Sequence, residues 1–177
     1  MRVLVGPGRF TYDKSTSFYA YQIGAQGQNV AVPNRGKITS TPASVSSFVI
    51  QTAAHAWTIK DRMFGMDHIR NVNINGDVPA MRIADDFPLA TLWRQHWHLD
   101  PAWTQVSGSA NGTRLVFAHP SGRRVTITTT GRISAVLRGS TRPVAGWHSP
   151  AFGSAVPAYD IVIRSYGRAC TTTFRVS

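Results

Sequence analysis

The 177-residue sequence predicts an all-β protein, an antiparallel β-sandwich of roughly ten to twelve short strands. Three observations predict this fold. Short apolar or alternating segments recur between Gly, Asn and Ser turn signals at the spacing typical of sandwiches and barrels. Thr and Ser are plentiful, whereas runs of helix-forming Ala, Leu, Glu and Lys are absent. No window of about twelve residues or more carries a 3.6-residue apolar period.

The expected strands follow one another along the chain, and turn signals separate them. The strands are Arg2–Val5, Val30–Val32, Ser46–Gln51, Ala56–Lys60, Ile69–Ile74, Ala80–Ala84, Ala90–Leu99, Arg114–Ala118, Arg124–Thr129, Ile133–Leu137, Ile161–Ser165 and Thr172–Val176. The turns are Asn34-Arg35-Gly36, Asn75-Gly76-Asp77, Asn111-Gly112, Ser121-Gly122, Thr130-Gly131 and Tyr166-Gly167. Phe18–Ile23 fits either a short helix or an aromatic loop.

The alternation within segment 124–129 places Val125 and Ile127 inward and the Thr residues outward. The neighbouring segment 114–118 is more uniformly apolar, which favours a place inside the sheet. Turn signals at Asn111-Gly112 and Ser121-Gly122 flank this segment, so consecutive hairpins or a meander are expected. The result is a pair of antiparallel sheets packed about 10 Å apart.

Composition indicates one globular domain over residues 1–177. Hydrophobic residues make up 42% and charged residues 15%, which excludes disorder. A chain of this length buries enough core to need no disulfide or metal for stability. Cys170 is the only cysteine, so an intrachain disulfide is excluded and the redox compartment stays open. We expect no membrane span and no signal peptide, because no apolar stretch is long enough.

The formal net charge is +11, from 19 Lys and Arg against 8 Asp and Glu. This balance predicts a polyanionic partner, either an acidic polysaccharide, a nucleic acid or an anionic membrane surface. Most of the cations are Arg, whose planar fork suits carboxylate, sulfate and phosphate. A general preference for Arg codons is the alternative, because the Arg residues are scattered along the chain.

His96 and His98 form the most suggestive local pattern. Residues two apart on a strand point to one face, so the imidazoles could form half of a zinc site. A third ligand is needed, and no Cys or carboxylate lies at an informative spacing. Trp93 and Trp97 share the opposite face and are expected in the core. The alternative is a His pair on a partly exposed sheet face that hydrogen-bonds to its neighbours.

Other titratable residues give weaker signals. Asp85 and Asp86 point to opposite faces and precede Phe87-Pro88, so a solvated turn is expected. Cys170 has no evident activator and is expected to be a small buried residue. No nucleophile-elbow, metalloprotease, phosphate-loop or Cys-pair motif is present, so we predict no catalytic residue. The isolated histidines are expected to be structural or exposed: His55, His119 and His148.

A basic aromatic cluster lies near the N-terminus, where Tyr12, Tyr19 and Tyr21 accompany Arg9 and Lys14. Such clusters can stack on sugar or base faces and pair with carboxylates. Arg9, Tyr12 and Tyr19 are therefore the candidate substrate-binding residues. The alternative is an ordinary aromatic edge of the core.

Several stretches, taken in order, resemble parts of one known domain. The most specific is the Gly-Trp-x-Ser-Pro-x-Phe-Gly pattern at residues 146–153. The others are Val3–Asp13 with its Gly6-Pro7-Gly8 turn, Ala25–Val32, Asp67–Val72, Met81–Asp85, Trp97–Pro101, Phe117–Gly122 and Val156–Ala158. Together they resemble the C-terminal β-sandwich of the heparinase II/III-like polysaccharide lyase family over nearly the whole chain.

The resemblance implies a function. Family members join an N-terminal α/α toroid to the sandwich and cleave uronate-containing polysaccharides by β-elimination. A base removes the proton next to the carboxylate, and an acid protonates the departing oxygen. The Tyr, His and Asn residues of that chemistry lie mainly in the toroid, which this sequence lacks. We therefore expect a sandwich that is inactive in isolation, with acidic polysaccharide and a separately encoded toroid as partners.

The resemblance also locates a metal site whose ligands are missing here. The family reads Asp-Pro-Gly and Ala-His-Asn where this sequence has Gly6 and Gln28. The family's upstream His-rich segment would precede residue 1, so the chain is expected to be N-terminally truncated. A neutral amide is a poor zinc ligand, and glycine has no side chain. We predict no zinc site and no cofactor.

Two alternatives stay open beside the lyase domain. The net charge of +11 also fits a free-standing basic module that binds sulfated glycan or nucleic acid. The third possibility is a purely structural or oligomerising sandwich.

Overall fold

The computed structural model describes residues 1–34, 48–90 and 92–177. Within these residues the strands form an eight-stranded sheet of order β2-β3-β4-β5-β16-β9-β8-β7 and a four-stranded sheet of order β1-β6-β15-β10. All strand pairings in both sheets are antiparallel. The predicted all-β sandwich is confirmed. No helix among the described residues is long and apolar enough to cross a membrane.

The elements have the following bounds. The larger sheet comprises β2 (Phe48–Ala53), β3 (Ala56–Asp61), β4 (His68–Asn75), β5 (Ala80–Asp86), β7 (Thr104–Ser107), β8 (Arg114–Ala118), β9 (Arg124–Thr129) and β16 (Ala169–Val176). The smaller sheet comprises β1 (Ala31–Pro33), β6 (Trp93–Leu99), β10 (Arg132–Arg138) and β15 (Tyr159–Ser165). Two ribbons pair β11 (Ser140–Thr141) with β12 (Val144–Ala145) and β13 (Trp147–Ala151) with β14 (Ser154–Pro157). The helical elements are α1 (Ser17–Ile23) and the 3₁₀ turn η1 (Ala25–Gly27).

The strand prediction succeeds where the pattern is local. Strands β8 and β9 begin and end at the predicted residues and pair as an expected hairpin, while the third strand of the meander is β7. The segment 2–5 is not a strand, because it makes only an isolated bridge from Leu4 to Leu99. Strand β7 and the two ribbons were not predicted. The predicted turn at 34–36 lies mostly outside the described residues, as does the start of the strand predicted at 46–51.

Segment 18–23 lies in a helix, not in an aromatic loop. Thr16 caps the N-terminus of α1, since its hydroxyl oxygen accepts a hydrogen bond of 3.1 Å from the backbone N–H of Tyr19. At the other end, the N–H of Gly24 donates to the carbonyls of Ala20 and Tyr21. These caps satisfy backbone groups that a seven-residue helix would otherwise leave unpaired.

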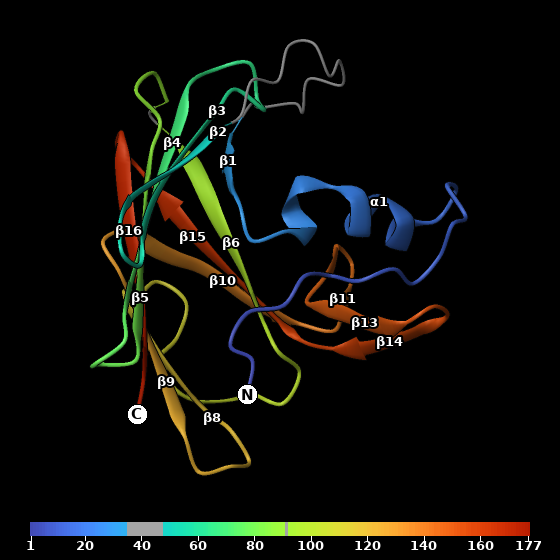
Figure 1. Cartoon of the computed structure of the whole chain (residues 1–177). Helices are drawn as coiled ribbons and strands as arrows, with labels where there is room; N and C mark the ends of the chain where they lie inside the picture. The colour runs from blue at the N-terminus through green and yellow to red at the C-terminus, as the bar shows by residue number, and fades with distance from the viewer. Residues whose placement is uncertain (35–47, 91) are drawn as a thin grey trace.

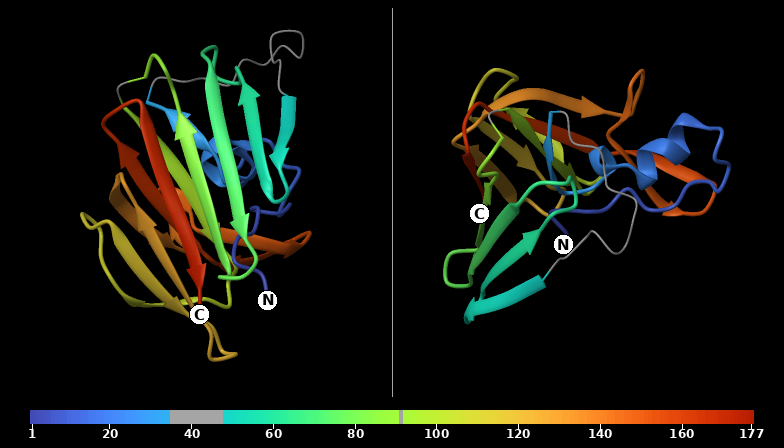
Figure 2. Two further views of the ribbon diagram at one scale, coloured as in Figure 1. Left: turned by 60° about the vertical axis from the view of Figure 1, so that its left-hand side comes forward. Right: turned by 90° about the horizontal axis from the view of Figure 1, so that it is seen from above.

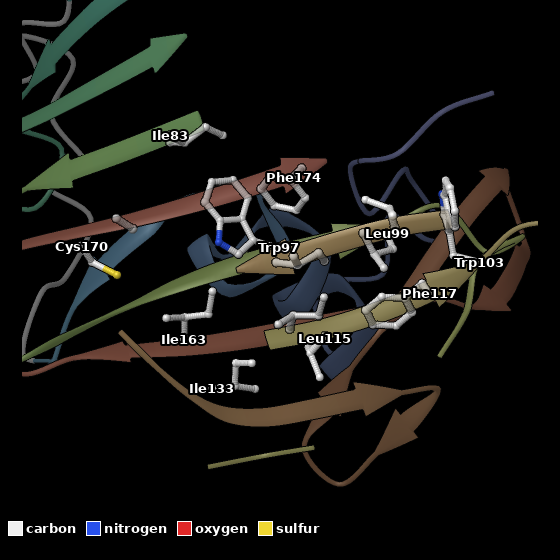
Figure 3. Packing of buried hydrophobic residues seen from close by; sticks show 14 of the residues in the cluster. Ile83, Trp97, Leu99, Trp103, Leu115, Phe117, Ile133, Ile163, Cys170 and Phe174 are labelled. Atoms are coloured by element: carbon white, nitrogen blue, oxygen red, sulfur yellow. The ribbon is translucent and has the colours of Figure 1, made fainter. Parts of the chain in front are cut away.

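The core lies between the two sheets, as Figure 3 shows. Strand β6 alternates, so Trp93 and Trp97 point inward and are 0% and 1% exposed, as predicted. The ring of Trp97 packs edge-on against Phe174 of the opposing sheet, with centroids 5.2 Å apart. Val125 and Ile127 are fully buried as expected, and Cys170 is a buried core residue. Burial also raises the pKa of the Cys170 thiol, which keeps it protonated.

Helix α1 and the ribbon β13–β14 lie beside the smaller sheet, on the side away from the larger sheet (Figures 1 and 2). Tyr21 of α1 and Gln26 of η1 hydrogen-bond to His98 on the outer face of β6. The outer face of the smaller sheet is therefore covered here by short, irregular elements. Polar and aromatic side chains gather in this region.

Candidate functional site

The N-terminal turn and Gln28 are neighbours in space. A Cβ atom added at Gly6 would lie 4.0 Å from the Gln28 Oε1 atom. Gln28 Nε2 donates a hydrogen bond of 3.0 Å to the carbonyl of Gln22, and His148 Nδ1 lies 2.8 Å from the carbonyl oxygen of Gly6. The positions that the sequence resemblance pairs are thus adjacent, but they offer a neutral amide and no carboxylate. These residues do not fit a zinc ion.

An exposed pair of aromatic rings lies next to this turn. The rings of Tyr12 and Phe152 stack with centroids 5.4 Å apart and an interplanar angle of 27°. The Arg9 guanidinium carbon lies 5.2 Å from the centroid of the Tyr12 ring. Tyr12 is 68% exposed and Phe152 is 66% exposed. We call Arg9, Tyr12 and Phe152 the aromatic platform.

The platform exists because segment 7–10 lies along the ribbon β13–β14. The Ser149 N–H donates to the carbonyl of Pro7 at 2.7 Å, and the Gly153 N–H donates to the carbonyl of Phe10 at 2.9 Å. Gly8 has a φ of +70°, and a Cβ there would lie 2.0 Å from the Ser149 carbonyl oxygen. Only glycine allows this approach. The close packing of Gly8 against Ser149 thus positions the backbone of Arg9.

The structure divides the aromatic cluster predicted from sequence. Arg9 and Tyr12 come together, whereas Tyr21 is 3% exposed and belongs to the interior. Tyr19 lies partly buried on α1, and no ring contact joins it to the platform within the described part of the chain. Phe152 was not among the residues predicted for this cluster, although it lies within the Gly-Trp-x-Ser-Pro-x-Phe-Gly pattern and stacks on Tyr12.

A second group of side chains lies on the covered outer face of the smaller sheet. His96 and His98 project from β6, and Asp160 of β15 is the register partner of His98. Asp160 Oδ1 lies 3.2 Å from His96 Nδ1 and 3.9 Å from His98 Nε2. We call these three residues the histidine cluster. The expected partly exposed face is wrong for His98, which is 1% exposed, and the His96 side chain is 12% exposed.

Hydrogen bonds from outside the sheet hold the His98 ring. Its Nε2 atom lies 3.1 Å from the carbonyl oxygen of Gln26, and its Nδ1 atom lies 3.4 Å from the Tyr21 hydroxyl. Burial lowers the pKa of His98 despite the opposing effect of Asp160, so the ring is neutral. Burial also raises the pKa of Tyr21 to about 12, so its hydroxyl stays protonated and can donate to the Trp147 carbonyl, 3.2 Å away.

Asp85 does not lie in a solvated turn, which corrects the sequence prediction. It is fully buried at the end of β5 and accepts two hydrogen bonds from Arg70, at 2.6 and 2.9 Å. His68 Nε2 and Gln95 Nε2 also contact the carboxylate, at 2.8 and 2.7 Å. Burial alone would raise its pKa, but the Arg70 charge and these hydrogen bonds lower the pKa to about 2. Asp86 instead pairs with Arg168 at the surface.

The Asp85 group is structural. Gln95 belongs to the smaller sheet and Asp85 to the larger one, so their hydrogen bond joins the two sheets. Arg70 also donates to the Asn29 carbonyl at 2.7 Å and lies over the ring of Trp97 at 5.1 Å. Every polar atom of the carboxylate is engaged inside the protein, which leaves no free position for a substrate.

Solved structures of heparinase III share this fold. One is the structure of heparinase III, the BT4657 gene product, with methylated lysines. It matches this chain with a TM-score of 0.74 and 11% sequence identity, over 99% of this chain and 28% of that chain. The same gene product matches in another structure with a TM-score of 0.72 and 10% identity. A further heparinase III structure gives a TM-score of 0.72 and 10% identity, over 98% of this chain and 27% of that chain.

No family model matches the sequence, and no curated protein matches it. At 10–11% identity the likeness to heparinase III is one of fold. This chain spans about 28% of the length of those heparinase III chains.

Proposed function

We propose that this chain is the β-sandwich part of a polysaccharide lyase that acts on acidic, uronate-containing polysaccharide by β-elimination. One observation carries the proposal, namely that 99% of the chain matches a single part of heparinase III. The net charge of +11 supports a polyanionic substrate, because it attracts carboxylate and sulfate groups at long range.

The chemistry requires a base at the carbon next to the carboxylate and an acid at the departing oxygen. In our proposal an α/α toroid domain supplies these groups, and this chain is inactive without it. The sandwich contributes one wall of the substrate cleft. The proposal assigns no catalytic residue to this chain.

The aromatic platform is the surface proposed to contact substrate. Exposed, stacked rings offer flat apolar faces to a sugar, and the Arg9 guanidinium can pair with a carboxylate or sulfate in two parallel hydrogen bonds. Tyr12 contacts both Arg9 and Phe152, so it is central to this surface. Tyr19 remains a candidate at the margin, on the adjacent helix.

Binding to polysaccharide tests the platform. We expect the purified chain to bind a uronate polymer in affinity electrophoresis, to retain binding at moderate salt, and to ignore a neutral glucan. Tyr12→Ala should weaken binding about tenfold, because stacking contributes about 1–3 kcal/mol. Tyr166→Ala is the matched control, since Tyr166 is also exposed and lies beside Arg164, with the guanidinium carbon 5.9 Å from the ring centroid. Equal loss in both variants would remove the platform from the proposal.

Activity tests the proposed division of labour. The products of β-elimination contain an unsaturated uronate that absorbs in the near ultraviolet. The chain alone should release none from uronate polymers. Release of such products by the chain alone would show that it carries its own catalytic groups.

The second candidate function is a free-standing basic module for sulfated glycan or nucleic acid, which the net charge of +11 favours. Nucleic acid binding rests on charge alone. Binding to DNA and heparin with equal affinity and the same steep salt dependence would favour this candidate. Discrimination between uronate polymers at moderate salt would favour the lyase domain.

A further inference from the structure

The histidine cluster has the composition of a transition-metal site. His96, His98 and Asp160 each offer one ligand atom, and these atoms all lie within 4.8 Å of one another. The two imidazoles come from β6 and the carboxylate from the neighbouring strand β15. Because all three residues lie in paired strands, the backbone ladder fixes their relative positions more firmly than loops would.

One separation matches that which a zinc ion imposes between its ligands, and a second is about 0.6 Å longer. Ligand atoms about 2.0–2.1 Å from a tetrahedral zinc ion lie about 3.3 Å from one another. Asp160 Oδ1 lies 3.2 Å from His96 Nδ1 and 3.9 Å from His98 Nε2. To bind one ion, side-chain rotations would have to shorten the 3.9 Å separation and draw together the two histidine ligand atoms, which lie within 4.8 Å of each other. His98 Nε2 would exchange its contact with the Gln26 carbonyl, 3.1 Å away, for the metal.

The surroundings supply what a metal-bound histidine needs. A metal-bound imidazole usually donates its other ring N–H to a fixed polar group. The Tyr21 hydroxyl lies 3.4 Å from His98 Nδ1 and can accept that hydrogen bond. The hydroxyl is itself held by the backbone of Trp147 through its carbonyl at 3.2 Å and its N–H at 3.3 Å.

Asp160 gives a further reason to expect a cation. Its side chain is 2% exposed, and its ion-pair contacts within the described residues are to the two histidines. A buried carboxylate needs a compensating charge, which a divalent cation supplies. His96 also lines a hollow of about 340 Å³ with Gln26 and Arg94, which provides a route to the cluster and room for a water ligand.

We propose that His96, His98 and Asp160 bind one divalent transition-metal ion, zinc being the best fit to two imidazoles and a carboxylate. This site is separate from the Gly6 and Gln28 positions. No third ligand for the His96 and His98 pair was evident in the sequence, and Asp160 is the residue that the strand pairing brings beside them. The proposal does not depend on the lyase function.

Metal titration tests the site. Protein stripped with a chelator and dialysed should bind one Zn²⁺ per chain in calorimetry, and Co²⁺ should give the visible absorption of tetrahedral coordination. His96→Ala and Asp160→Asn should each weaken binding about 100-fold or more, since the loss of a side chain that only hydrogen-bonds to a metal ligand weakens it about 10–100-fold. His55→Asn is the control, because His55 is exposed in the β2–β3 turn with a φ of 67°, which Asn tolerates.

X-ray absorption of the zinc-loaded wild-type protein avoids any dependence on the folding of variants. It should show nitrogen and oxygen ligands with the outer-shell scattering of two imidazoles. The proposal would be overturned if the spectrum showed sulfur ligands or if the wild-type protein bound no zinc. It would also be overturned if folded His96→Ala bound zinc with unchanged affinity, or if His55→Asn lost as much affinity as His96→Ala.

Discussion

Replacing Asp85 with asparagine should destabilise the protein strongly. The substitution keeps the shape of the side chain but removes its charge, which leaves Arg70 without its anion. The Arg70 side chain is 12% exposed and Asp85 is 0% exposed. Removing one partner of a buried ion pair costs about 3–5 kcal/mol, because the other charge stays buried and uncompensated.

The pKa of Asp85 gives a second measure of the same effect. It falls from the ordinary value of 3.8 to about 2, because the Arg70 charge and the hydrogen bonds from His68 and Arg70 outweigh the effect of burial. At about 1.4 kcal/mol per pH unit, this difference stabilises the folded state by about 2 kcal/mol at neutral pH. The expected loss in Asp85→Asn is therefore about 2–5 kcal/mol.

Urea denaturation at neutral pH, followed by fluorescence, measures the loss from the midpoint and slope. Asp86→Asn is the matched control, since it removes the adjacent carboxylate, whose partner Arg168 is a surface side chain. A double variant, Arg70→Met with Asp85→Leu, should recover only part of the loss, because it removes the unpaired guanidinium but still leaves His68 and Gln95 without their acceptor. A loss in Asp85→Asn no larger than in Asp86→Asn would refute the reasoning.

Three further predictions concern stability. The folded-state pKa of Asp85 is lowered to about 2, and that of His68 is raised because, against the effect of burial, Asp61 and Asp85 stabilise its charged form. Both residues therefore stabilise the folded state between about pH 4 and 6.5. The stabilisation from Asp85 is lost as pH falls toward 2. The stabilisation from His68 is lost as pH rises through its raised pKa. Urea midpoints that climb steadily from about pH 6 to 9 would contradict the His68 prediction. Gly8→Ala should lower the melting temperature more than Gly122→Ala, because both have positive φ but only the Gly8 Cβ would meet a backbone carbonyl at 2.0 Å; equal shifts would refute the close approach. Leu115→Ala, at a fully buried position, should cost about 2–5 kcal/mol in urea denaturation; a loss below about 1 kcal/mol would show that the site collapses around the smaller side chain.

The parts of the fold predicted from sequence are those whose signals are local. Strands β8 and β9 combine buried apolar positions with a turn at Ser121-Gly122, so both the strands and their pairing could be read along the chain. The ribbon β11–β12 has only two residues in each strand. Such short strands carry no periodicity, and their pairing depends on neighbours elsewhere in the structure.

Long-range pairing explains the errors at titratable residues. Asp85 precedes Asp86 and a Pro-containing turn, which is the local pattern of a solvated loop. Its environment is instead set by Arg70 on the neighbouring strand and Gln95 on the opposite sheet. Asp160 likewise joins the histidines only because β15 pairs with β6, and nothing local in either strand indicates that pairing.

The aromatic platform likewise combines residues that are close in the sequence with one that only the tertiary structure brings near. Arg9 and Tyr12 are three residues apart and were predicted together from the sequence. Phe152 reaches them only because segment 7–10 bridges to β13 at Ser149. A sequence pattern singled out the stretch around Phe152, but it did not indicate the surface to which that residue contributes.

Alternate side chains of strand β6 point to opposite faces of the smaller sheet. Trp93, Trp97 and Leu99 specify the interior, while His96 and His98 specify the chemistry of the opposite face. The two faces thus pack against different partners, the interior against the larger sheet and His98 against Tyr21 and Gln26. An insertion of one residue would exchange the two sets, placing imidazoles in the core and indoles outside. Strand β6 should therefore tolerate a change of side chain at the partly exposed Arg94 far better than any change in length.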